Sequence, residues 1–230
     1  MTTFWSGTMI KTKIENDLDL AEETFIQDDE LLGYINEAID ECEAEIHSLH
    51  EDYFLSKDFI PLVEGTEEYA LPTDIYANKI RRLVYKNGST VYPIERLKDW
   101  KKFEEYAAEL VNQSSTIYRY FPINSTPGTP MILLSPPAKE TSSTNVTIWY
   151  LRNATRLSAF SDTCDIPEFI NFILQYVKVR CYEKEGHPNT EKAMADLEQQ
   201  RAQMQSTLEG MVPDADNEIE PDLRFYEEMT

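Results

Sequence analysis

The sequence predicts an α+β fold: mainly a helical bundle of about four helices, with an inserted small antiparallel β-sheet domain and an extended C-terminal arm. Apolar residues recur at helical spacing near both ends of the chain. Short β-branched and aromatic runs separated by turn residues fill the middle, and the last residues lack periodicity. The expected domains are residues 1–52 and 161–211 for the two halves of the bundle, 53–160 for the β domain with one helix, and 212–230 for the docking arm.

The N-terminal helices of the bundle are expected over residues 9–18 and 28–50. In the longer helix, Asp28, Asp29 and Glu30 place negative charge at the start, where it suits the helix dipole. Apolar side chains then recur every three or four residues, at Leu31, Leu32, Ile35, Ala38, Ile39, Cys42, Ile46 and Leu49. This stripe predicts a long amphipathic helix that buries one face.

The middle of the chain predicts one small antiparallel sheet with a helix laid on it. Apolar runs on both sides of Gly65 predict a hairpin, and the runs around Asn87-Gly88 carry the strongest short hairpin signal. Helical spacing returns over residues 95–111. Three further strands are expected over residues 116–121, 131–135 and 145–151.

Two more helices are expected before the arm. The sequence DIPE at residues 165–168 has the form of a helix start, with Asp165 suited to cap it, and Gly186 marks the end of that helix. The helix is apolar on more than one face, which predicts that it is central to the fold or contacts two neighbouring elements. The last helix, after Pro188, carries a narrow apolar stripe that is broken by Arg201.

The arm, residues 212–230, holds seven acidic residues and one Arg. Three large apolar side chains, Leu223, Phe225 and Tyr226, fall close together near its end, which favours docking on a partner. A strap over its own domain is the alternative, and the composition leaves both open.

The overall charge limits the function. The 230 residues include 42 Asp and Glu against 21 Lys and Arg, which gives a formal net charge of −21. A polyanion of this size repels phosphate, so tight binding of duplex DNA through basic contacts is a poor hypothesis. The three widely spaced cysteines match neither a disulfide framework nor a zinc ligand set, which indicates a reducing cytoplasm. No stretch approaches the roughly 18 apolar residues that a membrane span needs.

The charge is unevenly distributed along the chain. Residues 15–52 hold 15 acidic residues and no Lys or Arg, whereas residues 79–102 hold eight basic residues against Glu95 and Asp99. This pattern suits a homo-oligomer in which the acidic face of one copy meets the basic face of the next. Two solvated faces of opposite sign would give the same pattern.

Signatures of catalysis are largely absent from the sequence. The chain has seven glycines and no glycine-rich phosphate loop, and no arrangement of Ser, Cys and His resembles a nucleophile site. His47 and His50 lie near Glu43 and Glu51 on the expected helix, but they lack a third ligand at a known spacing, so we interpret them as ordinary histidines. We therefore expect no enzyme, no catalytic residue, no metal site and no cofactor.

Three segments, taken in order, carry a resemblance to a known family. They are INEAI at residues 35–39 in the acidic helix, VEGTEEYALP at residues 63–72, and DIPE at residues 165–168. In this order they resemble the head-to-tail adaptor (connector) proteins of tailed bacteriophages, and G-T-x-x-Y-x-L-P at residues 65–72 is the most specific element. The likeness covers most of the chain. The departures are the acidic N-terminal extension, the helix after Lys98 and the proline-rich stretch over residues 122–137.

The resemblance implies a structural virion protein of the neck, below the portal, assembled in the host cytoplasm. Such adaptors form a dodecameric ring that binds the portal protein, continues the DNA channel and provides the platform for a tail or nozzle protein. Duplex DNA passes through without specific binding, and no membrane is involved. The C-terminal arm often grips the portal, and the residues here that match this role are Pro221, Leu223, Arg224, Phe225 and Tyr226.

Two further sets of residues are expected to act in the assembled ring, one as the channel lining and one as a contact between subunits. An acidic channel lining avoids the affinity for DNA that basic side chains create through counterion release. The expected lining residues are Glu30, Glu37, Asp40, Glu41 and Glu51. A ring also needs two different patches on each subunit. The expected inter-subunit basic patch consists of Lys79, Arg81, Arg82, Arg96, Lys98, Lys101 and Lys102.

The alternative function is that of an acidic DNA mimic that inhibits a nucleic-acid-binding enzyme by occupying its phosphate-binding cleft. A mimic needs acidic residues spread over its exposed surface, whereas this chain has a separate basic segment and an arm with an apolar tip. An enzyme that uses the acidic N-terminal helices as metal ligands is the third hypothesis.

Overall fold

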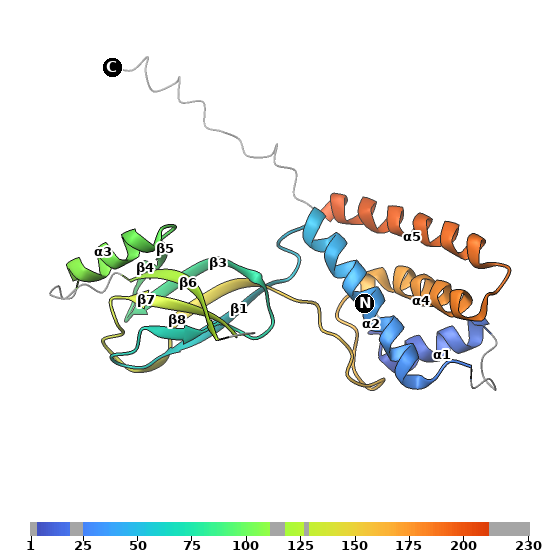
Figure 1. The fold of residues 1–230 in the computed structure, drawn as a ribbon, viewed down its shortest axis with the longest axis horizontal. Helices are drawn as coiled ribbons and strands as arrows, with labels where there is room; N and C mark the ends of the chain where they lie inside the picture. The colour runs from blue at the N-terminus through green and yellow to red at the C-terminus, as the bar shows by residue number, and fades with distance from the viewer. Residues whose placement is uncertain (1–3, 19–24, 111–117, 127–128, 212–230) are drawn as a thin grey trace, which may run out of the picture. The chain divides into compact units, whose positions relative to one another are not determined.

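The computed structural model describes residues 4–18, 25–110, 118–126 and 129–211 (Figure 1). Over these residues the fold is α+β, as predicted, with five α-helices and two four-stranded sheets. None of the described helices is long and apolar enough to span a membrane. The chain divides into two compact units: residues 1–50 with 156–230, called the helical unit below, and residues 51–155, called the β unit.

The helical unit contains four of the described α-helices. They are α1 (Gly7–Leu18), α2 (Asp28–Leu49), α4 (Ile170–Glu185) and α5 (Thr190–Met211). Helix α4 contacts each of the other three, and Figure 1 shows it alongside α1 and α5. Phe172, Ile173, Val177 and Cys181 of α4 are buried although they lie on more than one face of the helix. The prediction that this helix contacts at least two neighbouring elements is confirmed.

Helix α2 coincides with the predicted amphipathic helix. Ile35, Ala38, Ile39, Cys42 and Ile46 on its apolar stripe are fully buried. Each large aliphatic side chain buried in this way contributes about 1.5–3 kcal/mol. Packing of this face, more than intrinsic helix propensity, therefore stabilises α2.

The two ends of α4 differ in how well the sequence predicted them. At the start, a short 3-10 helix, η1 (Pro167–Phe169), precedes α4, and the N-cap of η1 is Ile166 rather than Asp165. At the end, Gly186 has a φ of 70°, the left-handed conformation that glycine adopts without strain. The N–H groups of Gly186 and His187 donate to the carbonyl oxygens of Glu183 and Tyr182.

The β unit contains two sheets, which corrects the prediction of a single antiparallel sheet. The first sheet, in the order β1-β8-β3-β4, is antiparallel and consists of β1 (Leu55–Leu62), β8 (Ser142–Arg152), β3 (Ile75–Asn87) and β4 (Thr90–Pro93). The second, in the order β2-β7-β6-β5, consists of β2 (Glu68–Ala70), β7 (Thr129–Ser135), β6 (Arg119–Thr126) and β5 (Glu95–Arg96), with β5 parallel to β6. Ile60 and Ile148 of the first sheet share one core with Tyr120 and Ile132 of the second.

The turn at Gly65 connects the two sheets and does not close a hairpin. Strand β1 pairs with β8 and strand β2 pairs with β7, so the hairpin predicted around Gly65 is wrong. Gly65 has a φ of 78°. The buried Tyr69 hydroxyl lies 3.1 Å from the carbonyl oxygen of Val63 and 3.0 Å from that of Thr66, to which it donates. The G-T-x-x-Y element is thus a crossover between sheets that its own tyrosine holds in place.

The second predicted hairpin is present in the structure, and the predicted helix after it is present but shorter. Strands β3 and β4 pair around Gly88, which confirms the hairpin. Helix α3 (Trp100–Leu110) begins later than expected, and residues 95–96 form β5 instead. The reason is Asp99, whose carboxylate accepts a hydrogen bond from the Lys101 N–H at 2.9 Å and so caps the helix at this point.

Candidate assembly surfaces

Four of the acidic residues expected to line a channel lie on α2, and each is paired with a basic side chain of the same unit. The pairs are Glu30 with Lys184, Glu37 with Arg180 at 3.0 Å, Asp40 with Arg156 at 2.7 Å, and Glu41 with Arg201 at 3.6 Å. Hydrogen bonds from Lys184 and from Tyr34 lower the pKa of the Glu30 carboxyl. These acids therefore link α2 to α4, to α5 and to the segment that precedes η1.

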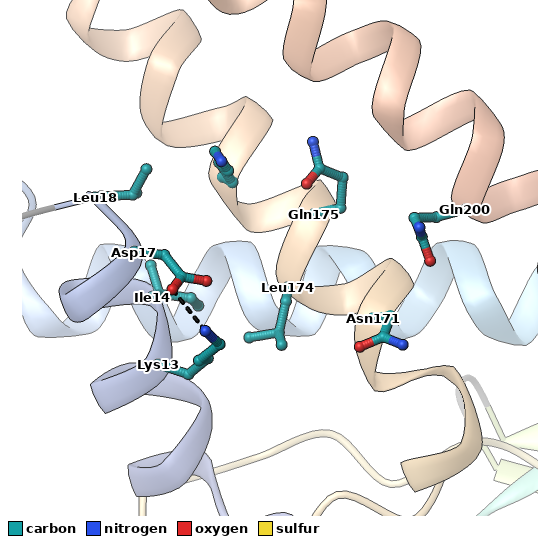
Figure 2. A pocket seen from close by; sticks show the side chains of 9 residues that line it. Lys13, Ile14, Asp17, Leu18, Asn171, Leu174, Gln175 and Gln200 are labelled. Atoms are coloured by element: carbon teal, nitrogen blue, oxygen red, sulfur yellow. Dashed lines mark hydrogen bonds and ion pairs between the residues drawn. The ribbon is translucent and has the colours of Figure 1, made fainter.

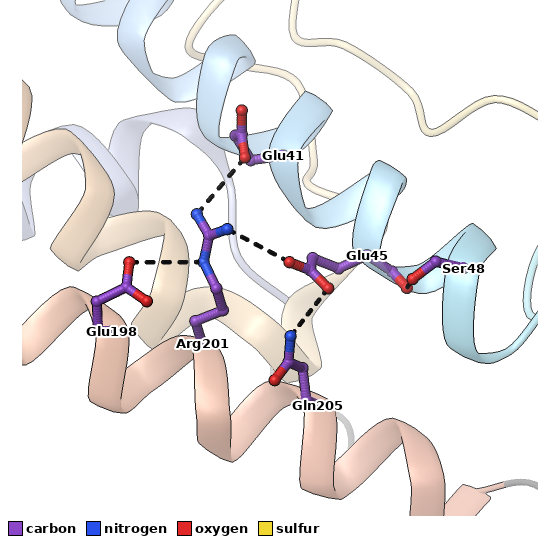
Figure 3. A network of polar contacts seen from close by, with 6 residues as sticks. All are labelled: Glu41, Glu45, Ser48, Glu198, Arg201 and Gln205. Atoms are coloured by element: carbon purple, nitrogen blue, oxygen red, sulfur yellow. Dashed lines mark hydrogen bonds and ion pairs between the residues drawn. The ribbon is translucent and has the colours of Figure 1, made fainter.

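Arg201 joins α5 to α2 at the point where it interrupts the apolar stripe of α5. Figure 3 shows its guanidinium between Glu41 and Glu45 of α2 and Glu198 of its own helix, at N–O distances of 3.6, 3.4 and 3.9 Å. The guanidinium also lies over the Phe172 ring of α4, 5.8 Å from its centroid. The break in the stripe was the one sign in the sequence of the contacts that Arg201 makes with α2, because Glu45 lies 156 residues away from Arg201 along the chain.

Glu51, the fifth acidic residue of the expected lining, belongs to the β unit rather than to the unit that holds the other four. Its carboxylate lies 2.8 Å from Lys79 and 2.5 Å from Arg81, and Arg81 also contacts Asp52 at 2.8 Å. Hydrogen bonds from Lys79 and Arg81 lower the pKa of Glu51 to about 2. Two residues of the expected basic patch thus neutralise a residue of the expected lining.

Three residues of the expected basic patch meet at one pocket of the β unit. Lys79, Arg81 and Arg96 line this pocket, which has a volume of about 260 Å³ and also includes Glu51. The backbone at its edge, at residues 77 and 78, has φ angles of 47° and 56°, left-handed values that non-glycine residues rarely adopt. The bulge in β3 that these two residues form lies between Ile75 and Ile80, where the pairing with β8 shifts register.

The other four residues of the expected basic patch lie elsewhere in the β unit. Arg82 lies over the ring of Trp149, with its guanidinium carbon 5.7 Å from the ring centroid. Lys98, Lys101 and Lys102 are exposed just before and within the first turn of α3. The structure therefore divides the basic patch into the three pocket residues, of which Lys79 and Arg81 are paired with acids, the aromatic-stacked Arg82, and an exposed lysine cluster.

A pocket of about 220 Å³ lies among α1, α4 and α5 of the helical unit. Figure 2 shows the Lys13–Asp17 ion pair of α1, at 2.6 Å, facing Leu174 and Gln175 of α4. The Gln175 amide donates to the carbonyl oxygen of Ala193 at 2.8 Å. The ion pair lies within α1, whereas the Gln175 bond connects α4 to α5.

The described residues offer little chemistry of their own. They contain no group of three or more His, Cys, Asp or Glu side chains that could hold a metal ion. The ring of His47 lies 3.6 Å from the Glu43 carboxylate, and both side chains are buried on α2. Cys42, Cys164 and Cys181 are free and buried, and burial raises the pKa of the Cys181 thiol to about 12. A protonated buried thiol is a poor nucleophile.

A match to a protein-family model decides the identity of the chain. The model described as SU10 adaptor protein matches residues 7–220, a range that includes every described helix and strand. The chain belongs to the SU10 adaptor protein family. No curated protein matches this adaptor.

Family membership makes the adaptor a structural component of a bacteriophage particle, which confirms the resemblance found in the sequence. The helix after Lys98 and the stretch over residues 122–137, where the adaptor departs from that resemblance, fall inside the matched range. The five arm residues Pro221, Leu223, Arg224, Phe225 and Tyr226 lie outside the described residues, and their role stays a prediction.

Proposed function

We propose that the adaptor forms a dodecameric head-to-tail ring that binds the portal protein, extends the DNA channel and carries the platform to which a tail or nozzle protein attaches. The observation that carries this proposal is the family match over residues 7–220. The ring size and the partners are those that the resemblance to head-to-tail adaptors implies.

The charge of the chain supports a channel through which DNA slides. Acidic residues outnumber basic residues by 42 to 21, so the surface as a whole repels phosphate. Glu37 and Glu41 are exposed on α2, where Arg180 and Arg201 offset part of their charge. Ion pairs of this kind also hold the side chains of the proposed lining in fixed positions.

The proposed ring needs two different patches that meet between neighbouring copies. Lys79 and Arg81 already contact Glu51 and Asp52 of their own unit, so they contribute less to such a contact. The lysine cluster at the start of α3, residues 98, 101 and 102, is exposed. We therefore assign the cluster, rather than the whole basic patch, to the interface between copies.

The portal-binding role of the arm is tested with the triple variant L223S/F225S/Y226S, which removes the apolar side chains and keeps the length and charge of the arm. Binding to purified portal rings, measured by co-sedimentation, is expected to fall at least about tenfold, because buried apolar anchors carry most of the affinity of a docked segment. Circular dichroism checks that the rest of the chain keeps its fold.

The matched control for this experiment lies in the same arm. E227Q/E228Q removes two neighbouring charges and keeps the apolar side chains, and its portal affinity is expected to stay within about threefold of the wild type. Equal binding by the triple-serine variant and the wild type would exclude the arm as the portal-binding element.

A further inference from the structure

The outer face of the first sheet of the β unit is a surface with an unusual composition for this chain. Its members lie on the side of the sheet opposite the core residues Leu83, Tyr85 and Ile148. The exposed or partly exposed side chains on this outer face include Lys57, Phe59, Arg82, Lys86, Val91 and Trp149.

The outer face is both basic and apolar. The Lys57 ammonium and the Arg82 guanidinium lie 5.5 and 5.7 Å from the centroid of the Trp149 ring. Phe59 is 44% exposed and Val91 is 51% exposed. A hollow of about 580 Å³ runs over this face, and none of the described residues that line it is Asp or Glu. In a chain with 42 acidic residues, an acid-free surface of this size indicates a binding face for an acidic partner.

One segment of the chain has the complementary composition. Residues 212–220 contain four acidic and no basic residues, and the acids stand at every second position: Asp214, Asp216, Glu218 and Glu220. In an extended chain, alternate side chains point to the same side, so this spacing would place all four carboxylates along one edge. The apolar tip of the arm, residues 223–226, comes after this acidic stem.

We propose that the acidic stem, residues 212–220, binds the outer face of the first sheet of a neighbouring copy, with its carboxylates against Lys57, Arg82 and Lys86. The stem then covers Phe59 and Val91 and leaves the apolar tip beyond it for the portal. This inference rests on the proposed ring, because the face belongs to a second copy. It gives the two halves of the arm different partners.

The test uses the full-length chain in the presence of portal rings. A photo-crosslinking amino acid replaces Val91, which lies on β4 at the edge of the face, and this protein is mixed with isotopically heavy wild type. After illumination, mass spectrometry is expected to find position 91 joined to heavy peptides from residues 212–220. Native mass spectrometry of the same sample reports independently whether rings form.

Charge variants make the experiment specific. K57E/K86E on the face is expected to lower the yield of this cross-link at least about tenfold, because it turns two attractive contacts into repulsive ones. K178E/K192E changes the net charge equally but lies on α4 and α5, and the yield is expected to stay within about twofold.

The possible outcomes separate this inference from the proposed function. Rings without a cross-link to residues 212–220 would overturn the docking site and leave the ring in place, whereas a chain that stays monomeric and forms no cross-link would overturn both. Cross-links to light peptides alone would show that each copy binds its own arm and would exclude the neighbouring copy. A cross-link from position 91 to an added thymidine oligonucleotide, with no cross-link to a peptide, would assign the face to nucleic acid instead.

Discussion

Glu51 is a residue whose charge depends on its neighbours in the folded chain. It is exposed, yet Lys79 and Arg81 contact its two carboxylate oxygens and lower its pKa from an ordinary value of 4.5 to about 2. A carboxyl with a lowered pKa stabilises the fold above its unfolded pKa, and this contribution disappears as the pH falls toward the folded pKa. For Glu51 the loss is expected between about pH 4.5 and pH 2.

The variant E51Q tests this pH dependence. Near pH 7 its melting temperature is expected to lie below that of the wild type, because Lys79 and Arg81 lose their ionised partner. The difference should shrink as the pH falls from 4.5 toward 2, where the wild-type carboxyl takes up a proton as well. Differential scanning fluorimetry across this pH range measures the difference in melting temperature. The control is E64Q, which makes an equal change of charge in the same unit. A difference that stays constant down to pH 2.5 would contradict the assigned pairing.

At the scale of elements, α5 is held to its neighbours by a mixture of apolar and ionic contacts. Leu197, Met204 and Leu208 are buried, and Arg201 stands between them with its charge directed to Glu41 and Glu45 of α2. The Arg201 side chain is 30% exposed and that of Glu45 is 19% exposed, so water compensates only partly when one partner is removed. The ion pair is therefore part of the packing between α2 and α5.

The variant R201A is expected to lower the free energy of unfolding of the helical unit by about 1–3 kcal/mol, because it leaves the partly buried Glu45 carboxylate without its cation and uncovers Phe172. Arg156 provides the control, since it pairs with Asp40 while its side chain is 63% exposed. R156A is expected to lower this free energy of unfolding by less than about 1 kcal/mol. Urea unfolding followed by circular dichroism at 222 nm, where helices dominate, compares the two. Equal losses would show that the Arg201 network is no stronger than a surface pair.

At the scale of the whole molecule, the acids of α2 serve folding and, in the proposed ring, passage of DNA. Lys184, Arg180 and Arg201 are the partners of Glu30, Glu37 and Glu41. Removal of the three carboxylates would leave three cations without these partners. If α2 faces the channel, those cations would contact phosphates and slow the DNA.

Particles that carry E30Q/E37Q/E41Q are therefore expected to eject DNA at least about threefold more slowly at low salt, and the delay should shrink as salt screens the new contacts. The control E64Q/E67Q/E68Q removes the same charge from the β unit. Ejection is measured by the fluorescence of released DNA, after circular dichroism confirms that the variant folds. Identical ejection rates for both sets of particles would show that α2 does not line the channel.

The features that the sequence predicted well depend on neighbours in the chain. The stripe of α2, the glycine that ends α4 and the hairpin at Gly88 all follow from side chains a few residues apart, where helical period, left-handed φ or turn length decides the outcome. The family resemblance rests on the same kind of local pattern, such as the turn at Gly65.

Long-range partners were beyond the reach of such patterns. The run before Gly65 has the composition of a strand, but its partner is β8, which pairs Leu55 with Leu151, and the run after Gly65 joins the other sheet. The acids of α2 were visible in the sequence, whereas their partners Lys184, Arg180 and Arg156 lie more than 100 residues away. Local spacing sets which residues become helix, strand or turn. Which strands pair and which charges meet is settled only when distant apolar faces pack into a common core, because that packing alone brings them within contact distance.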